Sequence, residues 1–295
     1  MVIENTPSLF LGIDGGGSKC RALLCDAKGQ PLSKSLAGPA NANQDLKGAC
    51  QALTLCAEAA LDAAGLSLSY LKYLHVGAGL AGMNVPATVA AMKNWSHPFA
   101  GLYLTTDLHI ASLGAHNGED GAVIITGTGS AGFSKSGSQR LMLGGYGLQL
   151  GDQGGGAWLG LEAVKASLLA SDGIGPDTAL TDAFEEVLGR GGSLAIMDNF
   201  IGQTSATFAK YAPMVFSLAD QGDRVALALV SQGAQYLQAM ATKLTAIGPV
   251  KLAMIGGLAA KWQPRLSADI REKLVDSVSS PEQGAIYFAR QQAKV

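Results

Sequence analysis

Three glycines follow an aspartate at the end of an apolar segment, in LFLGIDGGGSKC at residues 9–20. A glycine-rich turn between two strands can present several backbone N–H groups to an anion. The carboxylate of Asp14 would repel a phosphate unless a Mg²⁺ ion lay between the two. The segment is not a dinucleotide fingerprint, because strand signals follow it, and it lacks the Gly-Lys-Ser/Thr of a Walker A loop. An ordinary hairpin needs only one or two glycines, so the pattern favours a phosphate-binding turn.

A second glycine-rich turn, ITGTGSAG at residues 125–132, again follows an apolar strand. It adds three hydroxyl side chains, those of Thr126, Thr128 and Ser130, which can donate hydrogen bonds to an anion. Two such turns at matching places in the two halves of the chain could bind one polyphosphate. The pair indicates nucleotide binding more strongly than either turn alone.

Two further carboxylates lie next to predicted element ends. Asp107, in LTTDLH, comes at the end of a predicted strand and the start of a predicted helix. From position alone a helix N-cap is favoured, because Asp caps helices well. The alternative is a general base at the carboxyl end of a parallel strand, where open α/β sheets bind ligands. Asp152 lies in the glycine-dense stretch 144–160, whose cost in backbone entropy favours a substrate-lining loop over a purely structural one.

Strands and helices must position these residues. In the first half, short turns between apolar segments predict antiparallel strands, and the later alternation of strands with helices predicts a parallel part of the sheet. The expected strands are 9–14, 19–25, 31–37, 73–78 and 101–106, and the expected helices are 44–64, 85–95 and 107–116. Asn41 and Asn43 precede the first long helix, and a turn or cap role is the favoured interpretation for both.

The second half begins with the same order of elements. Residues 121–145 predict a strand, a glycine turn, a second strand, a turn and a third strand, followed by a helix at 153–171. A mainly helical region then extends to about residue 247, and strand 250–255 and a closing helix follow. The sequence predicts two α/β domains, residues 1–117 and 118–295, the second carrying a helical insertion.

The composition excludes several classes of function. Apolar residues make up 48% and charged residues 15% of the 295, which is typical of a well-buried globular protein. Lys and Arg form no runs, so no nucleic-acid or membrane partner is expected. No signal peptide or apolar stretch of about 18 residues is present. The four cysteines all lie early, without CxxC spacing, and fit reduced thiols in the cytoplasm. We expect no metal site built by the protein alone, because no HExxH or Cys/His cluster occurs.

The motifs together resemble a known family. DGGGSK and TGTGS, joined by TTD, are similar to the sugar kinase, Hsp70 and actin superfamily. GDQGGGAWLG, SDGIGPDTAL and MIGGLA extend the likeness to the N-acetylglucosamine kinases and glucosamine kinases of the BadF/BcrA type. The resemblance implies two ribonuclease-H-like domains with ATP in the cleft between them, a last helix (about 281–295) packed back on the first domain, and a homodimer.

The resemblance also implies roles for individual residues. Asp14 would hold Mg²⁺ through water, and Asp107 would be the catalytic base. The implied ATP-binding residues are Gly15, Gly16, Gly17, Ser18, Thr128 and Gly256. The implied sugar-binding residues are Asn41, Asp107, Ser130, Tyr146, Gly147 and Asp152. Tyr146 replaces a tryptophan of the animal enzymes and Gln153 a glutamate of many members, so the identity of the sugar stays open between N-acetylglucosamine and glucosamine.

The implied reaction transfers the γ-phosphoryl group of ATP to the 6-hydroxyl of the amino sugar. Two other functions fit the sequence less well. An ATPase that activates a dehydratase by electron transfer would need cysteines spaced for an iron–sulfur cluster, which the sequence lacks. A sugar-sensing regulator would need a DNA-binding module, but the first strand starts near residue 9 and no basic patch is present.

Overall fold

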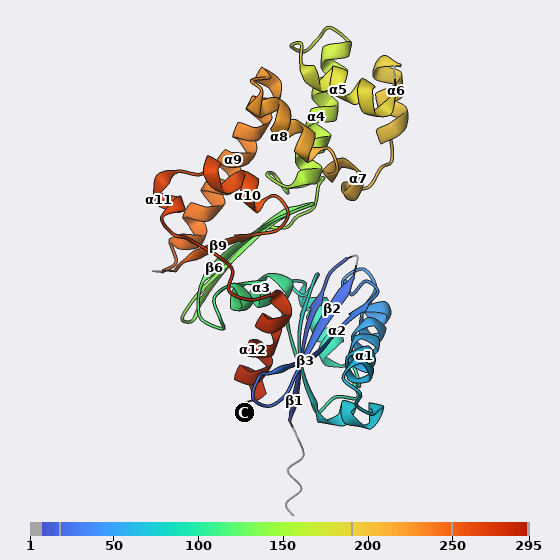
Figure 1. Ribbon diagram of the computed structural model, residues 1–295, viewed down its shortest axis with the longest axis vertical. Helices are drawn as coiled ribbons and strands as arrows, with labels where there is room; N and C mark the ends of the chain where they lie inside the picture. The colour runs from blue at the N-terminus through green and yellow to red at the C-terminus, as the bar shows by residue number, and fades with distance from the viewer. Residues whose placement is uncertain (1–7, 18, 190, 249, 294–295) are drawn as a thin grey trace, which may run out of the picture. The chain divides into compact units, whose positions relative to one another are not determined.

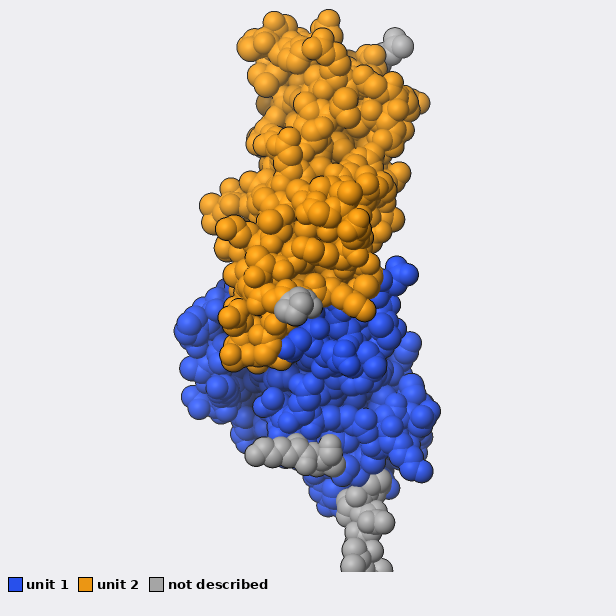
Figure 2. All heavy atoms as spheres, turned by 90° about the vertical axis from the view of Figure 1, so that its left-hand side faces the viewer, with its two compact units in different colours: residues 1–121, 276–295 blue, residues 122–275 orange. Residues whose placement is uncertain are grey.

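The chain folds into two compact units, coloured separately in Figure 2. The computed structural model describes residues 8–17, 19–189, 191–248 and 250–293. Unit 1 comprises residues 1–121 and 276–295, and unit 2 comprises residues 122–275. Each unit has its own sheet and its own hydrophobic core, so the two are described separately.

Unit 1 contains a five-stranded mixed sheet in the order β3-β2-β1-β4-β5. Its strands are β1 (Leu9–Gly15), β2 (Cys20–Cys25), β3 (Pro31–Ala37), β4 (Leu74–Leu80) and β5 (Gly101–Thr106). The first three strands run antiparallel to one another, because turns of only a few residues join them. β4 pairs parallel with β1 and with β5, and each of these connections carries a helix.

Helices cover both faces of this sheet (Figure 1). They are α1 (Leu46–Ala63), α2 (Pro86–Lys93), α3 (Asp107–Ala115) and α12 (Pro281–Ala293), with a short 3₁₀ helix at Leu68–Tyr73. α1 buries an apolar stripe against one face, and its N-terminus is capped by the carboxylate of Asp45, which accepts a hydrogen bond from Gly48 N–H. α3 and α12 pack together on the other face.

Glycines in the strands allow α12 to approach the sheet closely. A Cβ atom at Gly12 would lie 1.9 Å from the carbonyl oxygen of Glu282, and one at Gly77 would lie 2.0 Å from that of Ala285. Any side chain at these positions would push the helix away. The last helix of the chain is therefore part of unit 1, and its first turn is fixed against β1.

Unit 2 contains a second five-stranded mixed sheet, in the order β10-β9-β6-β7-β8. The strands are β6 (Ala122–Thr126), β7 (Ser130–Ser136), β8 (Gln139–Gly144), β9 (Leu252–Ile255) and β10 (Leu274–Val275). β6, β7 and β8 are antiparallel, and β9 is parallel to β6. The strand order is that of unit 1, with the same three-strand meander, but the two parallel strands β9 and β10 are shorter than their counterparts in unit 1.

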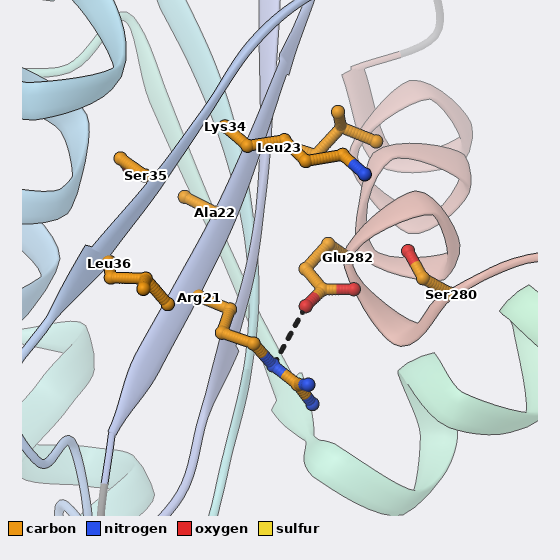
Figure 3. Close-up of a pocket in the computed structure, with 8 residues that line it drawn as sticks. All are labelled: Arg21, Ala22, Leu23, Lys34, Ser35, Leu36, Ser280 and Glu282. Atoms are coloured by element: carbon orange, nitrogen blue, oxygen red, sulfur yellow. Dashed lines mark ion pairs between the residues drawn. The ribbon is translucent and has the colours of Figure 1, made fainter.

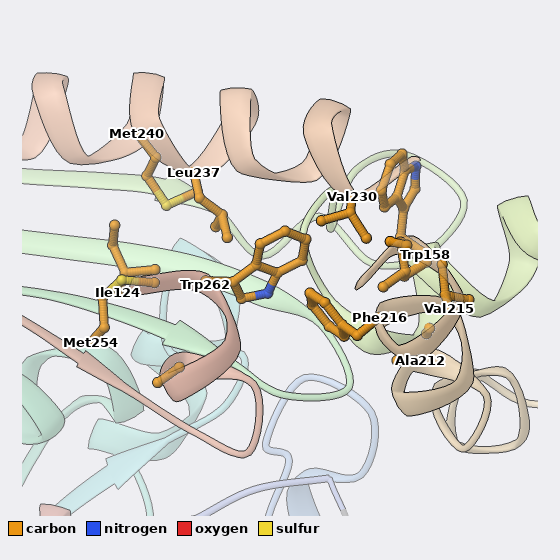
Figure 4. Packing of buried hydrophobic residues seen from close by; sticks show 14 of the residues in the cluster. Ile124, Trp158, Ala212, Val215, Phe216, Val230, Leu237, Met240, Met254 and Trp262 are labelled. Carbon is orange, nitrogen blue, oxygen red and sulfur yellow. The ribbon is translucent and has the colours of Figure 1, made fainter. Parts of the chain in front are cut away.

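The helices of unit 2 fall between β8 and β9 and after β9. They are α4 (Gly156–Ser171), α5 (Ala179–Leu188), α6 (Gly192–Phe200), α7 (Ser205–Ala209), α8 (Ala212–Asp220), α9 (Arg224–Thr245), α10 (Ala259–Trp262) and α11 (Ala268–Arg271), with a 3₁₀ turn at Gln263–Arg265. Figure 4 shows Trp262 in the core beside Leu237 and Phe216. The rings of Phe216 and Trp262 meet edge to face with centroids 4.8 Å apart.

The predicted fold class is confirmed: both units are α/β, and each sheet has the ribonuclease-H-like order of a meander flanked by parallel strands. Most predicted elements differ from the observed ones by a residue or two at their ends, as for the helix predicted at 44–64 and found at Leu46–Ala63. The two-residue strand β10 was not predicted. None of the described helices is both long and apolar enough to cross a membrane.

Candidate functional site

Two predicted functional carboxylates lie at the same edge of the sheet in unit 1. β1, β4 and β5 are parallel and in register, so that Asp14 pairs with Gly79 and Gly79 pairs with Thr105. Asp107 follows β5 directly, as the first residue of α3. The carboxyl ends of these strands therefore bring Asp14 and Asp107 close enough for their charges to interact, and the charge of Asp14 contributes to raising the pKa of Asp107.

The turn after β1 is tied to its neighbours through its carbonyl groups. Gly16 N–H donates to the carbonyl of Lys19 at 3.0 Å and closes the hairpin. The carbonyls of Gly15 and Gly16 accept hydrogen bonds from Ala81 N–H and Ala40 N–H, both at 2.9 Å. Carbonyl oxygens repel phosphate. Because these two carbonyls are hydrogen-bonded within the protein, they do not face a ligand, and the turn is suited to binding an anion through backbone N–H groups.

Space at the glycines of this turn differs from one to the next. A Cβ atom at Gly15 would lie 2.5 Å from Leu80 Cδ2 and 2.9 Å from Ala40 Cβ, so this position must stay bare. Gly17 is exposed and has no atom within 4 Å of such a Cβ, which leaves its backbone open to a ligand. Ser18, the fourth residue implied to contact ATP here, lies outside the described residues.

Asp14 is held by an ion pair that the sequence did not predict. Arg21 Nη2 donates to Asp14 Oδ2 at 2.8 Å, and Arg21 Nε lies 3.0 Å from Glu282 Oε1. Burial raises the pKa of Asp14 above its usual value, while the hydrogen bond and charge of Arg21 lower it. The charge of Glu282 adds to the increase. Asp14 is therefore a largely buried carboxylate whose charge is compensated mainly by the guanidinium of Arg21.

Asp107 is not the N-cap of its helix, contrary to the interpretation favoured from position alone. Thr106 takes that place, and its hydroxyl accepts a hydrogen bond from His109 N–H at 3.2 Å. The carboxylate of Asp107 instead accepts from its neighbour Leu108 N–H at 2.9 Å. Burial raises the pKa of Asp107, and that hydrogen bond opposes the increase. With the capping role filled by a threonine, the carboxylate is available for another task.

Asn41 has the turn role that the sequence favoured. Its carboxamide oxygen accepts hydrogen bonds from Asn43 N–H at 3.1 Å and Gln44 N–H at 3.3 Å. The same oxygen lies 2.9 Å from the position of a Cβ on Gly82, which has φ +86° and follows β4. Asn41 thus joins the loops after β3 and β4, next to a cavity of about 260 Å³ that it helps to line.

The second glycine turn joins β6 and β7 in unit 2. Thr126 pairs with Ser130 across the hairpin, and Gly127 N–H donates to the carbonyl of Gly129 at 3.0 Å. The carbonyls of Gly127 and Thr128 accept hydrogen bonds from the first two N–H groups of α4, at 2.7 Å and 2.9 Å. Thr128 is exposed. As in unit 1, carbonyls of the turn accept hydrogen bonds from the protein itself.

Asp152 packs against this second turn. It has φ +62°, a left-handed conformation that is costly for a residue with a side chain. Burial raises its pKa, and the backbone N–H groups of Ser130 and Gly147 oppose the increase. Within the described residues Asp152 Oδ1 is buried without a hydrogen-bond partner. A strained residue with an unsatisfied buried oxygen is a candidate for ligand binding.

The hydroxyl of Ser130 is buried and bonded to the glycine-dense loop. It donates to the carbonyl of Gln153 at 2.7 Å, which fixes the loop beside Asp152. Tyr146, in contrast, is 65% exposed, and Gly147 has φ +83° with open space, free of atoms within 4 Å, where a Cβ would lie. Exposed aromatic and bare backbone surface next to a carboxylate is suitable for a sugar ring and its hydroxyls.

Gly256 lies directly against the second turn. It follows β9 with φ +103°, and a Cβ atom there would lie 2.3 Å from the carbonyl oxygen of Thr126. Leu258 N–H donates to the same carbonyl at 3.1 Å. Only glycine fits this position, and Gly256 is exposed. Unit 2 therefore brings together Thr128, Gly256 and the loop that carries Asp152.

Three residues near these sites were missed by sequence reasoning. Arg21 and Glu282 line a cavity of about 540 Å³ in unit 1, where Figure 3 shows them facing each other. Tyr236 of α9 lies near Tyr146 and Asp152; burial raises its pKa, and the charge of Asp152 adds to the increase. Its hydroxyl is 3.2 Å from the place of a Cβ on Gly144. Nothing in the local sequence around these residues marks them as different from ordinary surface or core positions.

Comparisons with known proteins agree over most of the chain. The model of the BadF/BadG/BcrA/BcrD ATPase family matches residues 11–289. The chain is 32% identical over 284 residues to the glucosamine kinase of Vibrio cholerae, covering 95% of each protein. It is 28% identical over 255 residues to the N-acetyl-D-glucosamine kinase of Dictyostelium discoideum, covering 78% of this chain and 76% of that protein.

A solved structure is similar over nearly the whole length. It comes from Chromobacterium violaceum, and its protein is provisionally described as an N-acetylglucosamine kinase. Its sequence is 32% identical to this chain, and the TM-score is 0.84 over 96% of this chain and 99% of the other. The similarity thus includes the helices of unit 2 as well as the two sheets.

Proposed function

The chain belongs to the BadF/BadG/BcrA/BcrD ATPase family, and from this premise we propose that it is an ATP-dependent amino-sugar kinase. The observation that carries the proposal is the 32% identity to a glucosamine kinase over 95% of both proteins. The arrangement of Asp14 and Asp107 at one edge of the sheet in unit 1 agrees with this chemistry. Phosphoryl transfer needs positioned charge near the phosphates and a carboxylate near the acceptor hydroxyl.

The residues in unit 1 fit a Mg²⁺ ion that arrives with a nucleotide. Among the described residues no three His, Cys, Asp or Glu side chains gather as a metal-binding group. Mg²⁺ commonly uses one or two carboxylates, substrate phosphates and water, so Asp14 alone suffices as its protein contact. When bound, the ion would neutralise charge on the phosphates. The charge of Asp14 interacts with those of Asp107 and Glu282, so the surroundings of Asp14 favour an added cation.

We propose that both glycine turns bind the phosphates of ATP. In the first turn, the backbone of Gly15, Gly16 and Gly17 and the side chain of Ser18 take this role. In the second turn, the exposed Thr128 contacts phosphate, and Gly256 lies against the nucleotide. The support is the same in both turns: carbonyls are bonded within the protein, and Gly17, Thr128 and Gly256 are exposed.

Asp107 acts as the general base in this proposal. Its carboxylate accepts the proton of the sugar 6-hydroxyl and orients that oxygen for in-line attack on the γ-phosphorus. General-base assistance is worth on the order of 10² to 10⁴ in rate. Its raised pKa brings the base closer to neutral pH, which increases its driving force for taking the proton. The capping of α3 by Thr106 supports this role, because the carboxylate of Asp107 is not needed as the N-cap.

The residues proposed to hold the sugar are Asn41 and Asp107 in unit 1, and Ser130, Tyr146, Gly147 and Asp152 in unit 2. Asp152 and Tyr146 contact it directly, since one has a buried oxygen without a partner and the other is exposed beside it. Ser130 acts through the loop that it fixes, because its hydroxyl already donates to Gln153. A carboxylate at the sugar site suits the ammonium group of glucosamine as well as ring hydroxyls.

The proposal is tested by steady-state kinetics with ATP, Mg²⁺ and a panel of glucose, glucosamine, N-acetylglucosamine and N-acetylmuramic acid. We expect a kcat/KM for one amino sugar at least about a hundredfold above that for glucose, and a product phosphorylated at O6 by NMR. ADP formation that does not depend on any amino sugar, or equal rates for all four, would contradict the assignment. The amino sugar with the highest kcat/KM identifies the substrate.

A further inference from the structure

Arg21 makes two ion pairs with one guanidinium group, and both partners are largely buried. Its Nη2 contacts Asp14 Oδ2 at 2.8 Å, and its Nε lies 3.0 Å from Glu282 Oε1. The side chains of Asp14 and Glu282 are only 17% and 11% exposed, whereas that of Arg21 is 44% exposed. Because the guanidinium is planar and rigid, two contacts fix its position and therefore the position of the Asp14 carboxylate.

Glu282 is itself firmly held. It lies in the first turn of α12, whose N-terminus begins after Ser280, and the Ser280 hydroxyl accepts a hydrogen bond from Gln283 N–H at 3.3 Å. The backbone of Glu282 is in close contact with the bare Gly12 of β1. The last helix of the chain thus holds Arg21 in place through Glu282, and Arg21 in turn holds the side chain of Asp14 at the end of β1.

The charges around Asp14 make this support necessary. The charge of Asp14 interacts with those of two other carboxylates, Asp107 and Glu282. Arg21 contacts Asp14 and Glu282, and Lys19 acts on Asp14 only through its charge. Without Arg21, Asp14 would face two like charges with no bonded cation, and its side chain would turn away from them. The contact of Arg21 with Oδ2 leaves Oδ1 for the water shell of an ion.

We propose that Arg21, anchored by Glu282, is a positioning residue that holds Asp14 oriented toward the Mg²⁺ of the bound nucleotide. This inference rests on the proposed function, since it assumes that Mg²⁺ and ATP bind at the first turn. It assigns a task to two residues that contact neither phosphate nor sugar. It also gives the last helix of the chain an indirect part in nucleotide binding, through Arg21 and Asp14.

The test measures nucleotide binding without turnover, by calorimetry with a non-hydrolysable ATP analogue and no sugar. We expect Arg21→Met to raise the Mg²⁺ concentration for half-maximal binding at least about tenfold, with analogue binding in EDTA changed less than about threefold. Arg21→Lys keeps the charge but cannot make both contacts, so an intermediate value is expected. Glu282→Gln keeps an acceptor for Nε and should give a smaller increase than Arg21→Met.

Lys34→Met is the matched control. Lys34 is an exposed cation that lines the same cavity as Arg21 (Figure 3), and it has no contact with Asp14 among the described residues. Its removal should leave the Mg²⁺ dependence within about twofold of wild type. An Arg21→Met curve that coincides with that of Lys34→Met, or that shifts to lower Mg²⁺, overturns the inference. Wild-type protein that binds the analogue without any Mg²⁺ dependence overturns the proposed function as well.

Discussion

The two glycine turns occupy the same place in two sheets of the same topology, yet they are surrounded by different side chains. In both, the carbonyl groups of the turn accept hydrogen bonds from the protein, from Ala40 and Ala81 in unit 1 and from the start of α4 in unit 2. Beside the first turn lie three carboxylates and a guanidinium. Beside the second lie hydroxyls and a single strained aspartate, Asp152.

The comparison separates two tasks that one topology can support. The backbone of a tight turn suits phosphate in both units, because that property depends on main-chain geometry alone. The side chains at the strand ends differ, and in the proposed function unit 1 therefore supplies the groups for a cation and a proton, and unit 2 those for hydroxyl recognition. Variants can therefore be chosen that affect one task and not the other.

The largest effect is expected for Asp107→Asn. The amide cannot accept the proton of the sugar hydroxyl, so kcat should fall about 10³-fold or more while the protein still binds the sugar. Single-turnover kinetics and calorimetric titration with the amino sugar measure the two quantities separately. The matched control is Asp45→Asn, which changes another helix-terminal carboxylate of unit 1 and retains an N-cap. An Asp107→Asn enzyme with a tenth of the wild-type rate would refute the assignment of the base.

A smaller effect, confined to the sugar, is expected for Gly129→Ala. The new Cβ would lie 2.4 Å from Asp152 Oδ2, so the carboxylate must rotate away from its place. We expect the KM for the sugar to rise about tenfold, which corresponds to roughly 1.4 kcal/mol. Gly127→Ala is the control in the same turn, because nothing lies within 4 Å of the place that its new Cβ would take. Equal sugar KM values for the two variants would argue against a role for Asp152 in sugar binding.

Sequence reasoning found the residues whose signal is local. Asp14 was predicted because three glycines follow an apolar strand, and the edge it shares with Asp107 follows from the alternation of strands and helices. The ion pair of Arg21 with Glu282 was missed because the partners come from opposite ends of the chain. Such contacts leave no periodicity, and only the folded backbone brings them together.

The capping of α3 illustrates a different limit. Thr106 and Asp107 are both good capping residues, and the sequence cannot say which one the backbone places outside the first helical turn. The register of β5 with β4 decides it, since the strand extends to Thr106. A shift of one residue in the start of α3 would make Asp107 the N-cap, and its carboxylate would then be used for capping. The ends of helices and strands are the features that a sequence predicts least well.

The burial of Asp107 also predicts a pH-dependent change in stability. Its pKa in the folded state is raised, so the penalty on folding grows as pH rises from about 4, the pKa of an unfolded aspartate, to the folded-state pKa, and it stays constant above that value; below about pH 4 it is absent, because the carboxyl is protonated in both states. Asp107→Asn should therefore raise the Tm by a few degrees at pH 7.5, and the gain should shrink as pH falls toward about 4.5. Thermal unfolding across that range measures it. A Tm difference that is constant with pH would mean that the buried charge costs nothing.

The smallest effect is expected for Tyr236→Phe, which tests how far the proposed sugar site in unit 2 extends. The hydroxyl of Tyr236 lies over Gly144, at the start of the loop that carries Tyr146 and Asp152, and it is near both of those side chains. Loss of one neutral hydrogen-bonding group at such a site costs about 0.5 to 1.5 kcal/mol, so the KM for the sugar should rise about two- to tenfold with kcat and the KM for ATP unchanged. The phenylalanine keeps the ring that packs against the hydrophobic core of unit 2, so a fall in Tm without a change in KM would make Tyr236 a core residue and limit the site to the glycine-dense loop.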